Sequence, residues 1–185
     1  QRHQDALDRG LQRIAQTVQR LLEFARPSAL QRAPADLATI ALGALRLVLP
    51  AVAESGIRFD TDFEEDLAEL PVDVVQVEQV LINLLLNAIH AMRDSDMEGT
   101  ITIRLRAIAG GQRLEVDDAG PGIQAEDLER VFDPFFSTRP EGKGTGLGLS
   151  VSQSIAEAHG GRLTLGPSTP GRGVLARLDL VDTAD

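Results

Sequence analysis

The spacing of apolar residues divides the chain into one narrow helical seam and a longer region of mixed elements. Within residues 4–26 the apolar positions lie 4, 3, 4, 3 and 4 apart, with polar residues filling the rest: Leu7, Leu11, Ile14, Val18, Leu21 and Ala25. This heptad pattern predicts a helix that packs against a partner helix, as in a dimer, with packing onto its own domain as the alternative. We expect Pro27 to end the helix.

Beyond a linker at residues 28–34, helical and strand-like patterns are mixed. Helices are expected at 37–54, with a kink or early stop at Pro50, and at 74–93, 124–131 and 147–158. Strands are expected at 57–62, 70–72, 101–107, 113–116, 162–165 and 174–180. Because the strands do not form regular βαβ units, the pattern favours an α+β fold. The expected architecture is a two-layer α/β sandwich, a mixed and mainly antiparallel sheet with helices on one face, preceded by one long helix.

Composition removes several classes of function. Hydrophobic residues make up 43% of the 185 residues, enough for a sizeable core, and the absence of Cys excludes disulfide frameworks, thiolate metal sites and cysteine nucleophiles. The formal net charge of −10 makes the chain a poor match for nucleic acid or an anionic membrane. No uninterrupted apolar run reaches the ~18 residues of a membrane span, so we expect this part not to be membrane-inserted. Because it starts at Gln1 without a signal-peptide pattern, we expect a piece of a longer protein.

The helix expected at 74–93 is apolar almost all round, except on one face, so we expect it to be buried. Polar residues spaced 3, 4, 4 and 3 apart share that face: Gln76, Gln79, Asn83, Asn87 and His90. Since buried amides without partners cost ~1–3 kcal/mol each, a polar ligand or hydrated metal ion is expected to face them. Amide oxygens are suitable ligands for Mg²⁺, whereas a single core Asn could simply bond backbone.

Two glycine-rich segments carry further candidate chemistry. Asp118, in the segment VDDAGPGI at 116–123, stands at a strand end, where its carboxylate can accept from an amine such as that of adenine. Gly120 and Gly122 let backbone approach a flat ring, although a plain turn is the alternative. In GKGTGLGLS at 142–150, alternating glycines lead into a helix start, which is an anion site.

Between these segments lies VFDPFFSTR at 131–139, with half of the six Phe residues. We expect these Phe to anchor a mobile lid to the core, with plain core packing as the alternative. Arg139 and Lys143, the single lysine, can add positive charge for phosphate.

Taken in order, the four segments resemble the N, G1, F and G2 boxes of sensor histidine kinases, in the GHKL ATP-binding superfamily. The matching runs are QVLINLLLNA (79–88), DAGPGI (118–123), FDPFFSTR (132–139) and GTGLGL (144–149), and the resemblance extends from about 36 to 180. The wording of the third run is most similar to the nitrogen-regulator type. This resemblance implies a kinase of two-component signal transduction that transfers the γ-phosphoryl of ATP to a histidine.

The resemblance also implies roles for individual residues. Asn87 would bind Mg²⁺ and Asn83 would support that site, both as catalytic residues, and Asp118 would recognise the adenine amine. The remaining residues would frame the nucleotide and lid or contact phosphate: His90, Gly120, Gly122, Ile123, Thr138, Arg139, Lys143, Gly144, Thr145, Gly146, Leu147, Gly148 and Leu149. Related ATPases carry a Glu at the Asn83 position, so a neutral amide fits phosphotransfer better than hydrolysis.

By the same resemblance, residues 1–30 are the second helix of a dimerisation and phosphoacceptor hairpin plus linker, and 31–185 are the ATP-binding catalytic domain. None of His3, His90 and His159 resembles the phosphoacceptor, so this fragment is expected not to autophosphorylate. The implied partners are ATP, a response regulator receiver domain and a second copy in a homodimer, with no nucleic acid. The implied location is cytoplasmic, with membrane anchoring of the parent protein left open. The alternatives are a non-catalytic nucleotide-sensing or scaffold module, and a GHKL ATPase or anti-sigma-type serine kinase.

Overall fold

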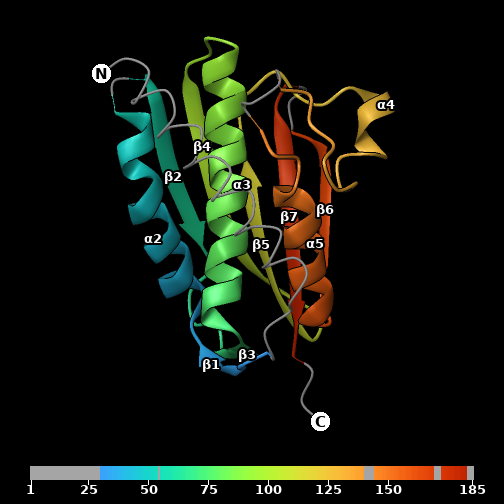
Figure 1. Cartoon of the computed structure of the whole chain (residues 1–185). Helices are drawn as coiled ribbons and strands as arrows, with labels where there is room; N and C mark the ends of the chain where they lie inside the picture. Colours follow the sequence, from blue (N-terminus) through green and yellow to red (C-terminus); the bar gives the residue numbers. More distant parts are fainter. Residues whose placement is uncertain (1–29, 54, 140–143, 169–171, 183–185) are drawn as a thin grey trace, which may run out of the picture.

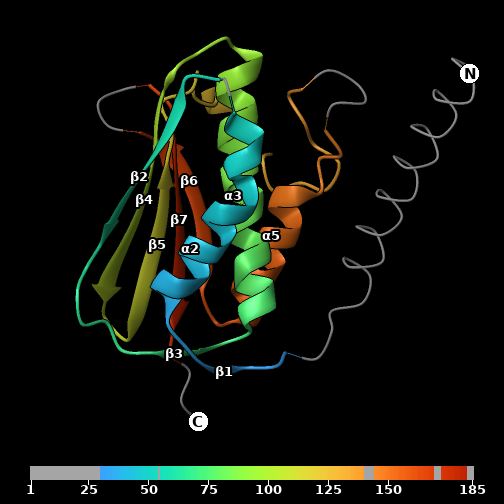
Figure 2. The ribbon, with the colours of Figure 1, turned by 90° about the vertical axis from the view of Figure 1, so that its left-hand side faces the viewer.

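A five-stranded sheet carries helices on one face, as Figures 1 and 2 show. The computed structural model describes residues 30–53, 55–139, 144–168 and 172–182. The helices on that face are α2 (Leu37–Val48), α3 (Val74–Asp94) and α5 (Gly148–Ala158). This arrangement confirms the two-layer sandwich, whereas the helix predicted at 4–26 lies outside the described residues.

The strand order in the large sheet is β2-β4-β5-β7-β6. These strands span β2 (Ile57–Phe63), β4 (Gly99–Ile108), β5 (Gly111–Asp117), β6 (Arg162–Pro167) and β7 (Val174–Val181). Only β2 and β4 pair in parallel, and every other neighbouring pair is antiparallel. The sheet is therefore mixed and mainly antiparallel, as predicted.

A second, two-stranded sheet was not predicted. Strand β1 (Ala33–Ala35) pairs antiparallel with β3 (Leu70–Val72), so part of the expected linker is a strand. Three residues with Pro34 at their centre are too short to show a period of two. Because β3 leads directly into α3, this pairing holds the segment before α2 next to the start of α3.

Helix boundaries follow their capping residues. Asp36 begins α2 by accepting hydrogen bonds from the backbone N–H groups of Ala38 and Thr39. Pro50 lies in a 3₁₀ turn at Leu49–Val52, so it is the early stop that the sequence allowed. Helix α4 (Ala125–Leu128) is shorter than the predicted 124–131.

The start of α3 and the end of α5 are joined by a buried hydrogen bond. The Asp73 N–H donates to Nε2 of His159 over 3.0 Å, and Nδ1 of His159 lies 2.8 Å from the Ile155 carbonyl. The Asp73 carboxylate accepts from the N–H groups of Gln76 and Gln31. His159 is 2% exposed, so this bond is shielded from water.

Helix α3 forms the centre of the core. It packs against α2, α5 and the sheet, and its buried residues are Val77, Val80, Leu81, Leu84, Leu85, Ala88, Ile89 and Met92. The prediction of an almost wholly buried helix is wrong in the first turn, where Val74 and Val75 are exposed. In this first turn, only one face of the helix is buried.

Within the described ranges, α3 alone is long and apolar enough to cross a membrane, with a mean hydropathy of 1.3 over its window. The sequence prediction required an uninterrupted apolar run. Polar residues interrupt α3, so it was not identified as a candidate membrane span. The core helix of a globular domain meets the same criterion, and α3 packs on the sheet.

Candidate functional site

A cavity of about 890 Å³ opens between α3, the glycine-rich segments and strands β5, β6 and β7. Its lining brings together most of the residues predicted from the sequence: Asn83, Asn87, His90, Asp118, Gly122, Ile123, Thr138, Arg139, Gly144, Thr145, Gly146, Gly148 and Leu149. Gly120 and Leu147 do not line it. Lys143 lies outside the described residues.

Helix α3 contributes the polar wall. Asn83, Asn87 and His90 line the cavity, whereas Gln76 and Gln79 do not. The prediction that the whole stripe faces one ligand is therefore wrong for its first two residues, which precede the cavity along the helix. Among the described residues, the exposed Asn87 side chain has no hydrogen-bond partner. Its amide is available to a bound group.

Asp118 follows β5 and is only 7% exposed. Its Oδ1 accepts from the N–H of Gly120 over 2.8 Å and from the N–H of Val174 over 3.2 Å. Burial raises the pKa of Asp118 above its ordinary value, although these two bonds act to lower it. Both described contacts use Oδ1, so Oδ2 is left to accept a hydrogen bond from a bound molecule.

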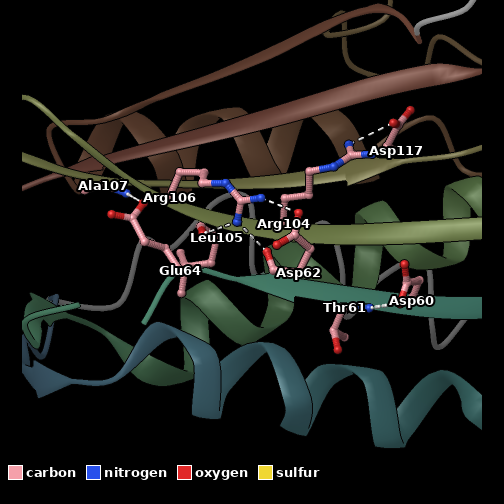
Figure 3. Close-up of polar contacts among 9 residues, drawn as sticks. All are labelled: Asp60, Thr61, Asp62, Glu64, Arg104, Leu105, Arg106, Ala107 and Asp117. Atoms are coloured by element: carbon pink, nitrogen blue, oxygen red, sulfur yellow. Dashed lines mark hydrogen bonds and ion pairs between the residues drawn. The ribbon is translucent and has the colours of Figure 1, made fainter. Parts of the chain in front are cut away.

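The neighbouring carboxylate faces the other side of the sheet. Asp117 pairs with the guanidinium of Arg104 over 2.8 Å (Figure 3). Arg106 bonds Asp62 on the same outer face (Figure 3). Since successive residues of a strand alternate between faces, only Asp118 of the two reaches the cavity.

Gly173 allows Asp118 to be held closely. Its φ is +97°, and an added Cβ would lie 1.8 Å from the Asp118 carbonyl oxygen. The Asp118 N–H donates to the Val174 carbonyl over 3.0 Å. The start of β7 is thus fixed against the end of β5, beside the carboxylate.

At Gly146, the end of the segment that we expected to be a lid lies against the backbone of Phe135, near the start of that segment. Its φ is +65°, and an added Cβ would lie 2.3 Å from the Phe135 carbonyl carbon. The Phe135 N–H donates to the Gly146 carbonyl over 2.9 Å. The two ends of residues 135–146 therefore meet backbone to backbone.

The three Phe residues of this segment have different surroundings. Phe132 packs against the core, and Phe136 lines the cavity with the Arg130 guanidinium 4.5 Å from its ring centroid. Phe135 has a positive φ of 68° and is 64% exposed. The prediction that all three anchor the segment is therefore wrong for Phe135, whose backbone turns its side chain outward.

Arg139 forms an ion pair at the mouth of the cavity. Its Nε donates to Oδ2 of Asp94 over 2.8 Å, which ties the segment to the end of α3. The cation expected from the sequence thus stands beside an acid that sequence reasoning missed.

In the residues that the structure describes, no three His, Cys, Asp or Glu side chains are grouped to hold a metal ion. Asn87 fits a hydrated Mg²⁺ held partly by phosphate oxygens, because its exposed amide lines the cavity.

Sequence reasoning missed Asp94 and Ser152, which shape the site, and it missed the contact of Val174 with Asp118. Asp94 lies four positions after His90 on α3, so helical spacing could have found it. Ser152 bonds Asn83, and Val174 bonds Asp118, across long sequence separations. No local pattern signals such contacts.

The chain resembles known proteins throughout this region. Residues 72–183 match the family described as histidine kinase-, DNA gyrase B- and HSP90-like ATPases. Sensor histidine kinase ZraS of Klebsiella oxytoca is 39% identical over 176 residues, which cover 94% of this chain and 37% of that relative. The chain thus spans little more than a third of that relative's length.

Two solved structures have the same fold. Full-length ShkA in complex with AMPPNP matches with a TM-score of 0.82 and 26% identity, covering 98% of this chain and 39% of that one. Histidine kinase ThkA in complex with response regulator protein TrrA matches with a TM-score of 0.80 and 26% identity, covering 99% and 51%. Fold, cavity and family match agree, and the chain belongs to the histidine kinase-, DNA gyrase B- and HSP90-like ATPase family, as a catalytic domain of the sensor histidine kinase type.

Proposed function

We propose that this chain binds Mg²⁺-ATP in the 890 Å³ cavity and transfers the γ-phosphoryl group to a histidine on a separate helical hairpin. The observation that carries the proposal is one cavity lined by two groups that keep bonding capacity among the residues the structure describes. These groups are the buried carboxylate of Asp118, with its Oδ2 free, and the amide of Asn87. The first suits an amino group, and the second suits a hydrated cation.

The adenine end would lie at Asp118. The Oδ1 atom is held by two backbone N–H groups, so the carboxylate cannot rotate freely. Oδ2 would then accept from the exocyclic amine of the base. Gly122 and Ile123 line the cavity beside it and would contact the ring.

The phosphate end would lie between α3 and the start of α5. The first N–H groups of α5, from Gly148 onward, have no acceptor within the helix and form an anion site. Arg139, His90 and the backbone of 144–146 would add contacts to phosphate oxygens. Mg²⁺ would be held by Asn87 and would neutralise charge on the phosphates, and Asn83 would support that end of the site.

The protein's contribution to phosphoryl transfer would be positioning and charge stabilisation. The neutral Asn83 offers no carboxylate to activate water, which favours transfer over hydrolysis. His159 is 2% exposed and both its nitrogens contact backbone atoms, so it is unsuited to be an acceptor. His3 and His90 do not resemble the phosphoacceptor of sensor histidine kinases either, so the acceptor would belong to another part of the parent protein.

The partners follow from the same proposal. ThkA, a structural neighbour, is solved in complex with a response regulator protein, which supports a receiver domain as the partner of the parent protein. We propose a homodimer in the cytoplasm, with residues 1–30 as the second helix of its hairpin and 31–185 as the catalytic domain.

The first test is calorimetry with AMPPNP, with and without Mg²⁺. The unsubstituted chain should bind AMPPNP more tightly with Mg²⁺ than without it. In Asn87→Ala this difference in affinity should disappear. Absence of nucleotide binding by the parent chain would favour the scaffold alternative.

The second test supplies the phosphoacceptor hairpin of the parent protein together with γ-labelled ATP. Acid-labile label on the hairpin histidine supports a histidine kinase. Release of free phosphate supports an ATPase, and acid-stable label on serine supports a serine kinase. A hairpin with its histidine replaced by Ala is the matched control and should stay unlabelled.

A further inference from the structure

We propose that Ser152 is a positioning residue that fixes the amide of Asn83 at the phosphate end of the cavity. This inference rests on the proposed function, in which Asn83 supports bound phosphate and Mg²⁺. Ser152 itself does not line the cavity, whereas Asn83 does, so Ser152 would act through Asn83.

The contact joins α3 and α5 directly. Nδ2 of Asn83 donates to Oγ of Ser152 over 2.8 Å. Ser152 is 1% exposed, so water does not compete for its oxygen. A hydrogen bond shielded in this way holds its donor more firmly than one at the surface.

A second contact packs against the same amide. A Cβ added at Gly148 would lie 2.4 Å from Oδ1 and 2.8 Å from Nδ2 of Asn83, so α5 approaches Asn83 as closely as glycine allows. Gly148 and Ser152 are four residues apart on α5 and share one face of the helix. The Asn83 amide thus packs against the helix start at Gly148, and its Nδ2 is bonded to Ser152.

This geometry gives the hydroxyl of Ser152 a specific task. Without it, Nδ2 loses its acceptor and the amide is free to rotate about its last side-chain bond. Oδ1 then no longer has one fixed position at the start of α5, where the phosphates are proposed to bind. A Ser152 that served only packing would leave the amide orientation unchanged when its hydroxyl is removed.

The sequence offers an unusually direct measurement, because Asn83 and Asn87 are the only asparagines in the chain. Selective ¹⁵N-asparagine labelling therefore gives two side-chain NH₂ groups in the NMR spectrum, which Asn83→Gln and Asn87→Gln assign. In Ser152→Ala the Asn83 NH₂ should shift and exchange faster with solvent, while the Asn87 NH₂ stays in place. Ser152→Thr, which keeps a hydroxyl, should restore the parent Asn83 signal.

Ser154→Ala is the matched control. The Ser154 hydroxyl donates to the Ser150 carbonyl on the same helix and does not touch Asn83. This variant should leave both NH₂ signals unchanged. Thermal unfolding followed by circular dichroism establishes that each variant is folded before its spectrum is compared.

The functional readout is phosphoryl transfer to the supplied hairpin. Loss of one fixed hydrogen bond should lower kcat about 2–10-fold in Ser152→Ala, with the KM for ATP nearly unchanged. Ser152→Thr should recover most of the rate.

The two failures are distinguishable. An Asn83 NH₂ signal that does not change in Ser152→Ala, or an unchanged kcat in that variant, overturns this inference. If the unsubstituted chain still binds nucleotide normally, the proposed function stands. No nucleotide binding by the parent chain refutes the proposed function, and the inference about catalysis falls with it.

Discussion

Replacing Asp118 should separate stability from nucleotide recognition. In Asp118→Ala, the N–H groups of Gly120 and Val174 lose their acceptor inside the protein. Each such loss costs about 1–3 kcal/mol, partly offset because a buried charge also disappears. We expect a net loss of roughly 2–4 kcal/mol, which lowers Tm by about 4–16 °C for a chain of this size.

Asp118→Asn should behave differently, because its amide oxygen can still accept both bonds. Burial raises the pKa of Asp118 despite those bonds, so the desolvation of the charge outweighs them in the folded protein. Removing the charge should therefore leave stability at pH 7 equal to or above that of the parent chain.

The pH dependence has a definite sign. A carboxyl group whose pKa is raised by folding favours the folded state fully below its ordinary value of 3.8. That contribution is lost as pH rises through the raised pKa. The free energy of unfolding of the unmodified chain, relative to that of Asp118→Asn, should therefore fall as the pH rises from 3.8 through the raised pKa of Asp118. Above that pKa the difference should stay constant up to neutral pH.

Nucleotide affinity should fall in the same variant. The new side-chain amide would offer a donor where the base amine needs an acceptor, and losing a bond to a charged group costs about 1.5–3 kcal/mol, or about 10–150-fold in Kd. The parent chain should prefer ATP to ITP, which has no exocyclic amine, and Asp118→Asn should lose that preference. Asp117→Asn is the matched control and should bind within about 2-fold of the parent, because Asp117 faces Arg104 on the outer face (Figure 3).

Calorimetry and circular dichroism suit these assays, since the chain contains neither Trp nor Tyr. The reasoning would be refuted if Asp118→Asn lost as much stability as Asp118→Ala. It would also be refuted if Asp118→Asn kept the parent affinity and the preference for ATP.

Three further predictions concern other parts of the site. Asn87→Ala should weaken Mg²⁺-dependent AMPPNP binding about 10-fold while Tm stays within about 2 °C, because the exposed amide has no partner in the described protein; equal loss without Mg²⁺ would contradict this role. Gly146→Ala should cost about 1–3 kcal/mol in urea unfolding, because of its φ of +65° and its contact with Phe135, and should speed proteolysis of the segment; unchanged proteolysis would argue that this contact does not hold the segment. His159→Ala should cost about 2–4 kcal/mol, since the Asp73 N–H is left unpaired, yet keep labelling of the supplied hairpin; loss of labelling in the folded variant would reopen His159 as an acceptor.

The elements with many local signals were predictable from the sequence. Helix α3 has Asp73 as its cap and a long apolar stripe, and the β4–β5 hairpin turns at Gly110. Strand β1 was missed because three residues around Pro34 show no periodicity. Burial was overestimated at Val75, since apolar composition does not reveal which face of a helix meets the sheet.

The candidate site was predictable as a set of residues but not as a set of contacts. The boxes named Asn83, Asn87 and Asp118, and the cavity brings them together. The partners that hold Asn83 and Asp118, at Ser152 and Val174, lie 69 and 56 positions along the chain. Contacts at such separation depend on helix packing and strand order, which no short pattern encodes.

The parallel pairing of β2 with β4 has a consequence for the order in which the protein folds. The register pairs Ile57 with Gly99, so the pairing of β2 with β4 brings together segments that the whole of α3 separates along the chain. The β4–β5 hairpin needs only a short turn, and forming it loses far less chain entropy. We therefore expect β2 to join the sheet late in refolding. In the native protein its amides should exchange hydrogen through openings that leave the β4–β5 hairpin protected.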